Sequence, residues 1–189
     1  MRLVSWRRTD ARACARWGHA KPTSPPEGPQ DATVDEYVGE ARLLVSEDAA
    51  AAFERLSGRL FAYDIFPPRL MRHVVCPPGP LAAGTLVVQQ VGLRVLAVES
   101  AVRVVETWER TTGSQRSAGF RYVTLAGHPE RGCASFEVRL TPDGRVEVVL
   151  AARSRAGSVL TTFGRPVARW IQMAATRAAL RRLTEAPSG

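Results

Sequence analysis

The sequence contains few of the segments that mark export, membrane insertion or metal chemistry. No apolar run reaches the roughly 18 residues that suggest a transmembrane helix, so none is expected. The first 20 residues carry arginines every few positions and no apolar core, so no signal peptide is expected. Histidine occurs only three times, at His19, His73 and His128. A histidine metal cluster is therefore not predicted, and neither a metal nor a cofactor is expected.

Motifs that carry well-known chemistry are also missing. The sequence has no phosphate-binding loop, no dinucleotide-binding glycine motif, no zinc-protease motif and no serine-hydrolase motif. Its three cysteines, Cys14, Cys76 and Cys133, are odd in number and lack metal-binding spacing. The simplest expectation is a reducing, cytoplasmic compartment in which Cys133 is an inert small side chain. An enzyme is therefore not the favoured hypothesis.

The chain has 189 residues, and its apolar fraction of 45% and charged fraction of 23% are typical of a folded protein. Its formal net charge is +8, but residues 1–21 supply +5 of it, and arginines elsewhere are scattered. Nucleic acid is therefore an improbable partner. A proline-rich stretch at 22–29 follows, so residues 1–33 are predicted to form a flexible basic tail, and residues 34–185 a single domain. The alternative is a basic arm that binds an acidic partner.

The first part of the domain reads as a strand, a helix and an irregular connection. A strand is predicted over 37–45. Ser46 is the expected N-cap of a helix whose apolar residues recur at helical spacing and which stops before Pro67. Residues 67–84 are rich in proline and glycine, which predicts an ordered connection without regular structure.

From residue 85 the apolar period changes to two, which predicts antiparallel strands. Strands are expected over 85–91, 93–98, 101–109, 116–125, 133–140 and 145–153. Thr141-Pro142-Asp143-Gly144 has the composition of a hairpin turn. A long helix is predicted over 162–183, and its buried face is expected to hold Val167, Trp170, Ile171, Ala174 and Ala178.

This order of elements indicates an α+β fold, in which a curved antiparallel sheet wraps a long C-terminal helix. That arrangement is the helix-grip fold, and it often encloses an apolar cavity between the sheet and the helix. The sequence therefore predicts an interior that can hold a small molecule.

One loop gathers polar side chains of several kinds. Gly127-His128-Pro129-Glu130-Arg131-Gly132 links two predicted strands and carries an imidazole, a carboxylate and a guanidinium. It is interpreted either as a rigid structural connection or as a cavity mouth at which His128 and Arg131 contact a polar head group.

Three further residues are candidates because the pattern directs them toward the cavity. Tyr122 shares the inward alternation of Phe120, and its buried hydroxyl needs a partner. Trp170 lies on the apolar face of the last helix, either as core or as a cavity lid. Arg155 follows the last strand, either solvated or near the cavity entrance.

Several separated segments resemble one uncharacterised family. They are residues 122–132 with the strand Phe136-Glu137-Val138, then 65–68, 80–85, 153–155 and 163–166. They resemble the family known as domain of unknown function 1990, over about residues 34–185. The resemblance implies a soluble bacterial or plant protein with a START-like, helix-grip fold, and it implies no established activity or site residue.

Three functions remain open. The first is binding of a small apolar or amphipathic molecule between the sheet and the C-terminal helix, with Tyr122, His128, Arg131, Glu137, Arg155 and Trp170 as candidate site residues. The second is an enzyme on the same fold that uses His128, Tyr122 or Glu137 for proton transfer. The third is an interaction module that uses the arginine-rich tail. The ligand and the oligomeric state do not follow from the sequence.

Overall fold

The computed structural model describes residues 2–5, 11–23, 33–93, 96–156 and 165–185. The strands within these residues are β1 (Arg2–Ser5), β2 (Thr33–Glu40), β3 (Met71–Cys76), β4 (Leu86–Leu93), β5 (Leu96–Thr112), β6 (Gln115–Thr124), β7 (Glu130–Leu140) and β8 (Val146–Ala156). The helices are α1 (Ala11–Gly18), α2 (Ala49–Phe61) and α4 (Arg165–Thr184).

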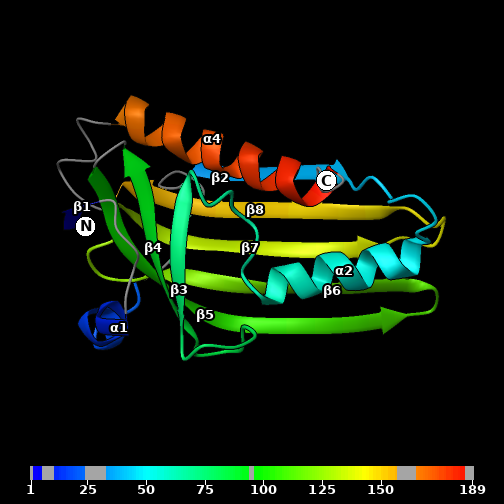
Figure 1. The fold of residues 1–189 in the computed structure, drawn as a ribbon, viewed down its shortest axis with the longest axis horizontal. Coiled ribbons are helices and arrows are strands. Elements are labelled where there is room, and N and C mark those ends of the chain that lie inside the picture. The colour runs from blue at the N-terminus through cyan, green and yellow to red at the C-terminus, as the bar shows by residue number, and fades with distance from the viewer. Residues whose placement is uncertain (1, 6–10, 24–32, 94–95, 157–164, 186–189) are drawn as a thin grey trace.

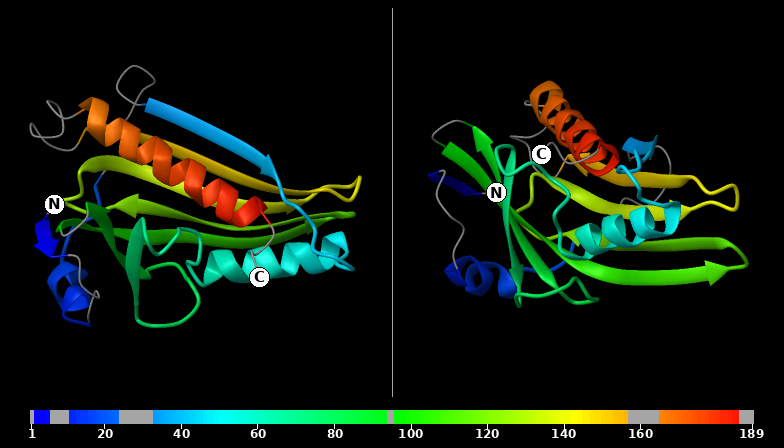
Figure 2. Two further views of the ribbon diagram at one scale, coloured as in Figure 1. Left: turned by 45° about the horizontal axis from the view of Figure 1, so that its top comes forward. Right: turned by 45° about the vertical axis from the view of Figure 1, so that its right-hand side comes forward.

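The strands form one antiparallel sheet in the order β2-β8-β7-β6-β5-β4-β3, and β1 pairs with the start of β5. The sheet is strongly curved, and its inner, concave face is covered by α2 and α4 (Figure 1). Helix α4 lies along β8 and β2, whereas α2 lies over β6 and β7 (Figure 2). This α+β architecture is the predicted helix-grip fold.

The predicted alternation of the long strands is confirmed. Phe120 on β6, Phe136 on β7 and Leu150 on β8 all face the concave side and belong to the main core. The rings of Phe120 and Phe136 stack with centroids 5.2 Å apart. The hairpin between β7 and β8 is also confirmed, because Gly144 adopts a φ of 82° there and its N–H bonds to the Thr141 carbonyl at 3.0 Å.

Some element boundaries differ from the sequence predictions. Strand β3 lies inside the segment expected to be irregular. Its six residues stand between two proline pairs and form an antiparallel ladder with β4. The two strands expected over 93–109 form one long strand, β5, with a register shift between Val104 and Glu106. The N-cap of α2 is Asp48, whose carboxylate accepts from the Ala51 N–H at 2.7 Å, and not Ser46.

The buried face of α4 is also shifted by one residue in its described part. Ala179 and Leu183 are buried there, whereas Ala178 is half-buried. The side chains of residues 165–172 are outside the description. The phase is set by close contact with β2, where a Cβ on Gly39 would come within 3.0 Å of Leu180. The helical spacing of apolar residues in the sequence does not predict that contact with β2.

The N-terminal residues are joined to the sheet, which corrects the predicted boundary at residue 33. Helix α1 lies against the convex side of β3 and β4, at the end of the molecule away from α2 (Figure 1). Its Ala13 and Trp17 are buried against Leu86, Val88 and Ala101. Residues 24–32 are outside the description. Helix α1 is therefore an integral cover of the sheet.

A disulfide attaches α1 to the sheet. Cys14 of α1 and Cys76 of β3 are bonded, with their Cα atoms 5.9 Å apart, while Cys133 is a free thiol. The sequence led us to expect separate thiols and, from them, a reducing compartment. The disulfide between Cys14 and Cys76 contradicts the expectation of separate thiols. It also removes the reason for expecting a reducing compartment, because a stable disulfide is typical of oxidising surroundings.

A buried carboxylate makes the second attachment. Glu99 of β5 has no exposed surface, and it accepts hydrogen bonds from Arg16 at 3.0 and 3.2 Å, Trp17 Nε1 at 3.1 Å and Gln90 Nε2 at 3.1 Å. We call these four residues the convex-face cluster. Burial alone would raise the pKa of Glu99, but the three donors outweigh it, so the pKa lies below its ordinary value of 4.5.

Candidate functional site

Of the six residues predicted from the sequence, the structure describes the side chains of four, and these four do not share one face of the sheet. Tyr122 faces the concave interior, with its ring centroid 5.8 Å from that of Phe136. Glu137 lies on the opposite face of β7 and forms an ion pair with Arg139 at 2.8 Å. The side chains of Arg155 and Trp170 are outside the described residues, although their backbones lie in β8 and α4.

The loop before β7 is folded on itself. His128 Nδ1 lies 3.0 Å from the backbone N–H of Glu130, which donates to it. Burial lowers the pKa of His128 to about 4, so the ring is neutral near pH 7. Arg131 is exposed and pairs in register with Arg155. His128, Tyr122 and Glu137 therefore do not form a common proton-transfer site.

A different set of polar side chains lies together in the interior. His73, Gln89 and Ser100 are direct cross-strand neighbours on β3, β4 and β5, on the concave side. Two tyrosines complete the group: Gln89 Nε2 donates to the hydroxyl of Tyr63, and the Gln89 amide is close enough to Tyr122 to lower the pKa of its hydroxyl. We call these five residues the interior cluster.

The electrostatics of the interior cluster favour neutral groups. Burial raises the pKa of Tyr63 well above its ordinary value, and it also raises the pKa of Tyr122, although the bond from Gln89 opposes both shifts. Burial lowers the pKa of His73, whose ring meets that of Tyr63 edge-on at 5.0 Å. Near pH 7 the cluster is therefore a set of uncharged hydrogen-bonding groups.

Tyr63 is held in a backbone conformation that tyrosine rarely adopts. It follows the C-cap of α2 with a φ of 57°, and the N–H groups of Tyr63 and Asp64 bond to the carbonyls of Leu60 and Arg59 at 2.9 Å each. This is a Schellman ending, where glycine is the usual residue. The left-handed conformation costs a tyrosine about 1 kcal/mol or more. The local structure is thus arranged to direct this ring into the interior.

Small residues flank the cluster on the concave face. Tyr122 of β6 pairs with Ala134 of β7, which in turn pairs with Ala152 of β8. All three side chains are only half-buried, although β6, β7 and β8 lie inside the sheet. Tyr122 is thus deep enough for burial to raise its pKa and yet retains accessible surface. Tyr122 therefore lies at the edge of the packed core.

Sequence reasoning identified Tyr122 and missed the other four members of the interior cluster. A signal for Gln89 was present, because it alternates with Val87 and Val91 in a predicted strand and should face inward with them. His73 was missed because β3 was expected to be irregular. Tyr63 gave no signal, since its placement depends on how α2 ends.

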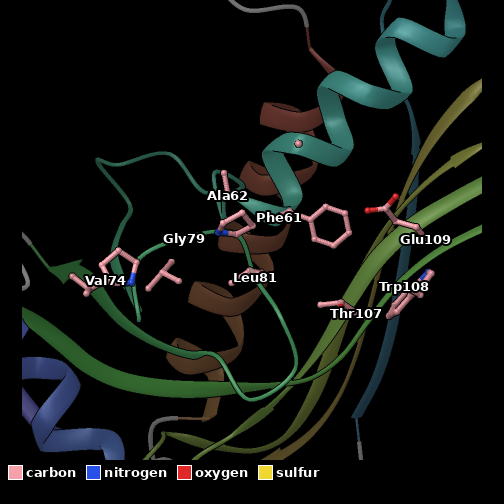
Figure 3. A pocket seen from close by; sticks show the side chains of 12 residues that line it. Phe61, Ala62, Val74, Gly79, Leu81, Thr107, Trp108 and Glu109 are labelled. Atoms are coloured by element: carbon pink, nitrogen blue, oxygen red, sulfur yellow. The ribbon is translucent and has the colours of Figure 1, made fainter.

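An open groove of about 1010 Å³ lies elsewhere, between the end of α2, the segment from Val74 to Leu81, and β5. Figure 3 shows Phe61 of α2 pointing across this groove toward Glu109 of β5. None of the six predicted site residues lines it, and it differs in place from the predicted cavity beside the C-terminal helix. It also borders Val75, which lies two residues from His73 on the same face of β3.

The described part of the chain contains neither a candidate metal site nor a candidate membrane-spanning helix. No group of three or more histidine, cysteine, aspartate or glutamate side chains there could hold a metal ion. No helix there is long and apolar enough to cross a membrane.

Several solved structures are similar to this chain at low sequence identity. A hypothetical protein from Helicobacter pylori has a TM-score of 0.50 and 12% identity, over 84% of this chain and 89% of that protein. Norcoclaurine synthase from Thalictrum flavum, solved with dopamine and hydroxybenzaldehyde, has a TM-score of 0.48 and 12% identity, over 86% and 95%. The major latex-like protein 151 of Panax ginseng has a TM-score of 0.42 and 10% identity, over 82% and 99%.

No curated protein matches the chain significantly. The family model described as a domain of unknown function, DUF1990, matches residues 15–182, which include Arg16, Trp17 and the whole interior cluster. Because that match covers most of the sequence, the chain belongs to the DUF1990 family.

Proposed function

We propose that this protein binds a small apolar or amphipathic molecule inside the helix-grip fold, between the concave face of the sheet and α4. The observation that carries the proposal is the interior cluster. Polar side chains are expensive to bury, and here five of them meet on a face otherwise lined by apolar and aromatic residues. A few convergent polar groups in an apolar interior are typical of small-molecule sites.

The residues beside the cluster support the same location. Ala134 and Ala152 provide little side-chain volume, and together with Tyr122 they stay half-buried under the covering helices. A ligand body placed there would contact the ring of Tyr122, which packs against Phe136 with centroids 5.8 Å apart. Its polar end would then meet the hydroxyl of Tyr122.

The strained ending of α2 adds an independent argument. A glycine at position 63 would relieve the left-handed backbone, but it would remove a ring and a hydroxyl from the interior. Residues held in sparsely populated backbone regions cluster at binding and catalytic sites. The position of Tyr63 therefore supports a role for its side chain in the interior.

The test is native mass spectrometry of the protein purified without organic solvent, followed by extraction and identification of any released compound. We expect a bound mass that disappears on denaturation and that is reduced in Tyr122→Ala. Glu137→Gln is the matched control, because its side chain lies on the other face of the sheet. A clean unliganded mass, with no thermal shift across a panel of lipids, alcohols and ketones, would contradict the proposal.

A further inference from the structure

The chemistry of the interior cluster narrows the ligand class, given the proposed function above. We infer that the polar end of the ligand is uncharged, such as a hydroxyl or a carbonyl, and that Gln89 and Tyr122 recognise it. The site would thus take neutral amphipathic molecules and reject carboxylates and ammonium ions of the same skeleton.

The first argument is that the described residues place no buried counter-charge on the concave side. Among the described residues, Glu99 is the one charged side chain in the buried set, and it belongs to the convex-face cluster. The buried polar side chains near Tyr122 are amides and hydroxyls, such as Gln89 and Ser100. An ion transferred to this interior would lose its hydration without gaining a partner of opposite charge.

The second argument is the position of the nearest carboxylates. Asp64, Glu130 and Asp35 lie half-buried around the rim of the concave face. Asp64 forms ion pairs with Arg59 at 3.2 Å and Arg182 at 2.7 Å, and the other two also have partners. These acids are therefore not free counter-ions for an ammonium group, and their negative charge disfavours a carboxylate ligand.

The third argument is the hydrogen-bonding capacity of the cluster. Gln89 uses its amide nitrogen on the Tyr63 hydroxyl, and its amide also lies near the Tyr122 hydroxyl. A phenol hydroxyl is both donor and acceptor, and an amide also offers a carbonyl oxygen. The pair of Tyr122 and Gln89 can thus donate to a ligand carbonyl or exchange hydrogen bonds with a ligand hydroxyl.

The test uses five probes with one skeleton: naphthalene, naphthylmethanol, acetonaphthone, naphthoate and naphthylmethylammonium. Their dissociation constants are measured near neutral pH by equilibrium dialysis with the full chain. We expect the alcohol and the ketone to bind at least about tenfold more tightly than either ion. Tyr122→Phe and Gln89→Leu should bring the alcohol and the ketone toward the affinity of naphthalene, while Glu137→Gln should leave all five unchanged.

The outcomes separate this inference from the proposed function. Equal binding of all five probes, or tighter binding of an ion, would overturn the neutral-ligand inference and leave interior binding in place. Loss of the alcohol preference in Glu137→Gln but not in Tyr122→Phe would also overturn it, because recognition would then lie on the other face. Binding of no probe would count against both.

Discussion

Gln89 and Gln90 are neighbours in β4, yet they belong to opposite faces of the sheet and to clusters of opposite character. Gln90 donates to the Glu99 carboxylate under α1, whereas Gln89 donates to the Tyr63 hydroxyl in the interior. The convex-face cluster is charged and is covered by a helix. The interior cluster is neutral and includes Tyr122, which keeps accessible surface.

This difference separates a structural attachment from a candidate binding site. A buried carboxylate with three donors holds α1, a helix of eight residues that would be marginal alone. An interior that gathers neutral hydrogen-bonding groups beside small residues can instead accept a ligand. The predictions below test each side of that distinction, from the largest expected effect to the smallest.

Glu99→Ala should destabilise the fold most, by about 3–5 kcal/mol, because it leaves the buried Trp17 and Gln90 donors and Arg16 without their acceptor. Urea denaturation monitored by tryptophan fluorescence measures the change. Glu137→Ala is the control, and loss of its pair with Arg139 should change stability by about 1 kcal/mol or less. Equal losses of stability in the two variants would contradict a structural role for the convex-face cluster.

Cys14→Ser should cost about 2–4 kcal/mol, because the disulfide joins residues 62 positions apart and restricts the unfolded chain. Adding reductant should lower the free energy of unfolding of the native sequence by the same amount. It should leave the free energy of unfolding of the Cys14→Ser variant unchanged. Thiol titration of the unreduced protein should find one accessible or denaturant-exposed thiol, Cys133. Three reactive thiols would contradict the attachment.

Ala134→Leu and Ala118→Leu compare two alanines on the concave face. Ala118 is 1% exposed, so a larger side chain there should overpack the core and cost about 1–3 kcal/mol. Ala134 is half-buried beside Tyr122, so leucine there should be tolerated and should weaken ligand binding. Thermal unfolding of both variants measures the contrast, and a similar loss at both sites would indicate a filled interior.

Tyr63→Phe should cost about 1 kcal/mol through loss of one buried hydrogen bond to Gln89. Tyr63→Gly separates the backbone from the ring, because it relieves the positive φ but opens a cavity. In chemical denaturation, the free energy of unfolding of Tyr63→Gly should therefore be well below that of Tyr63→Phe. The reverse order would show that the ring contributes little.

Acid should affect the two buried histidines and the convex-face cluster in different pH ranges. The folded pKa values of His73 and His128 lie below the ordinary 6.5, so stability is complete above pH 6.5 and falls as the pH drops toward the folded values. The pKa of Glu99 lies below 4.5, so its contribution is lost only below that pH. A plot of the free energy of unfolding against pH should be flatter between pH 6.5 and 4.5 in the double variant His73→Asn, His128→Asn than in the native sequence. An unchanged slope would contradict the assignment of this loss of stability to the two histidines.

The sequence was most informative where one face of a strand is buried. Strands β6, β7 and β8 alternate apolar and polar residues, so their existence and inward faces could be predicted, including that of Tyr122. Strand β3 could not, because its six residues lie between two proline pairs that dominate local expectation.

The remaining errors arise from contacts between distant segments. Arg16 and Trp17 belong to a basic segment whose composition suggests a tail, and their role depends on Glu99, which is 82 or more residues away. The interior cluster likewise needs the register of three strands and the ending of α2. Local pattern fixes which face a residue occupies, but not which side chains meet there.

The most direct test of the binding interior is alanine-methyl NMR during titration with naphthylmethanol. Ala134 lies next to Tyr122 on the concave face and Ala152 lies next to Ala134, whereas Ala13 and Ala101 are buried in the core between α1 and the sheet. We predict that the first pair shifts on binding and the second pair does not. Shifts confined to Ala13 and Ala101, or saturable binding that moves neither concave methyl, would contradict a site beside the interior cluster.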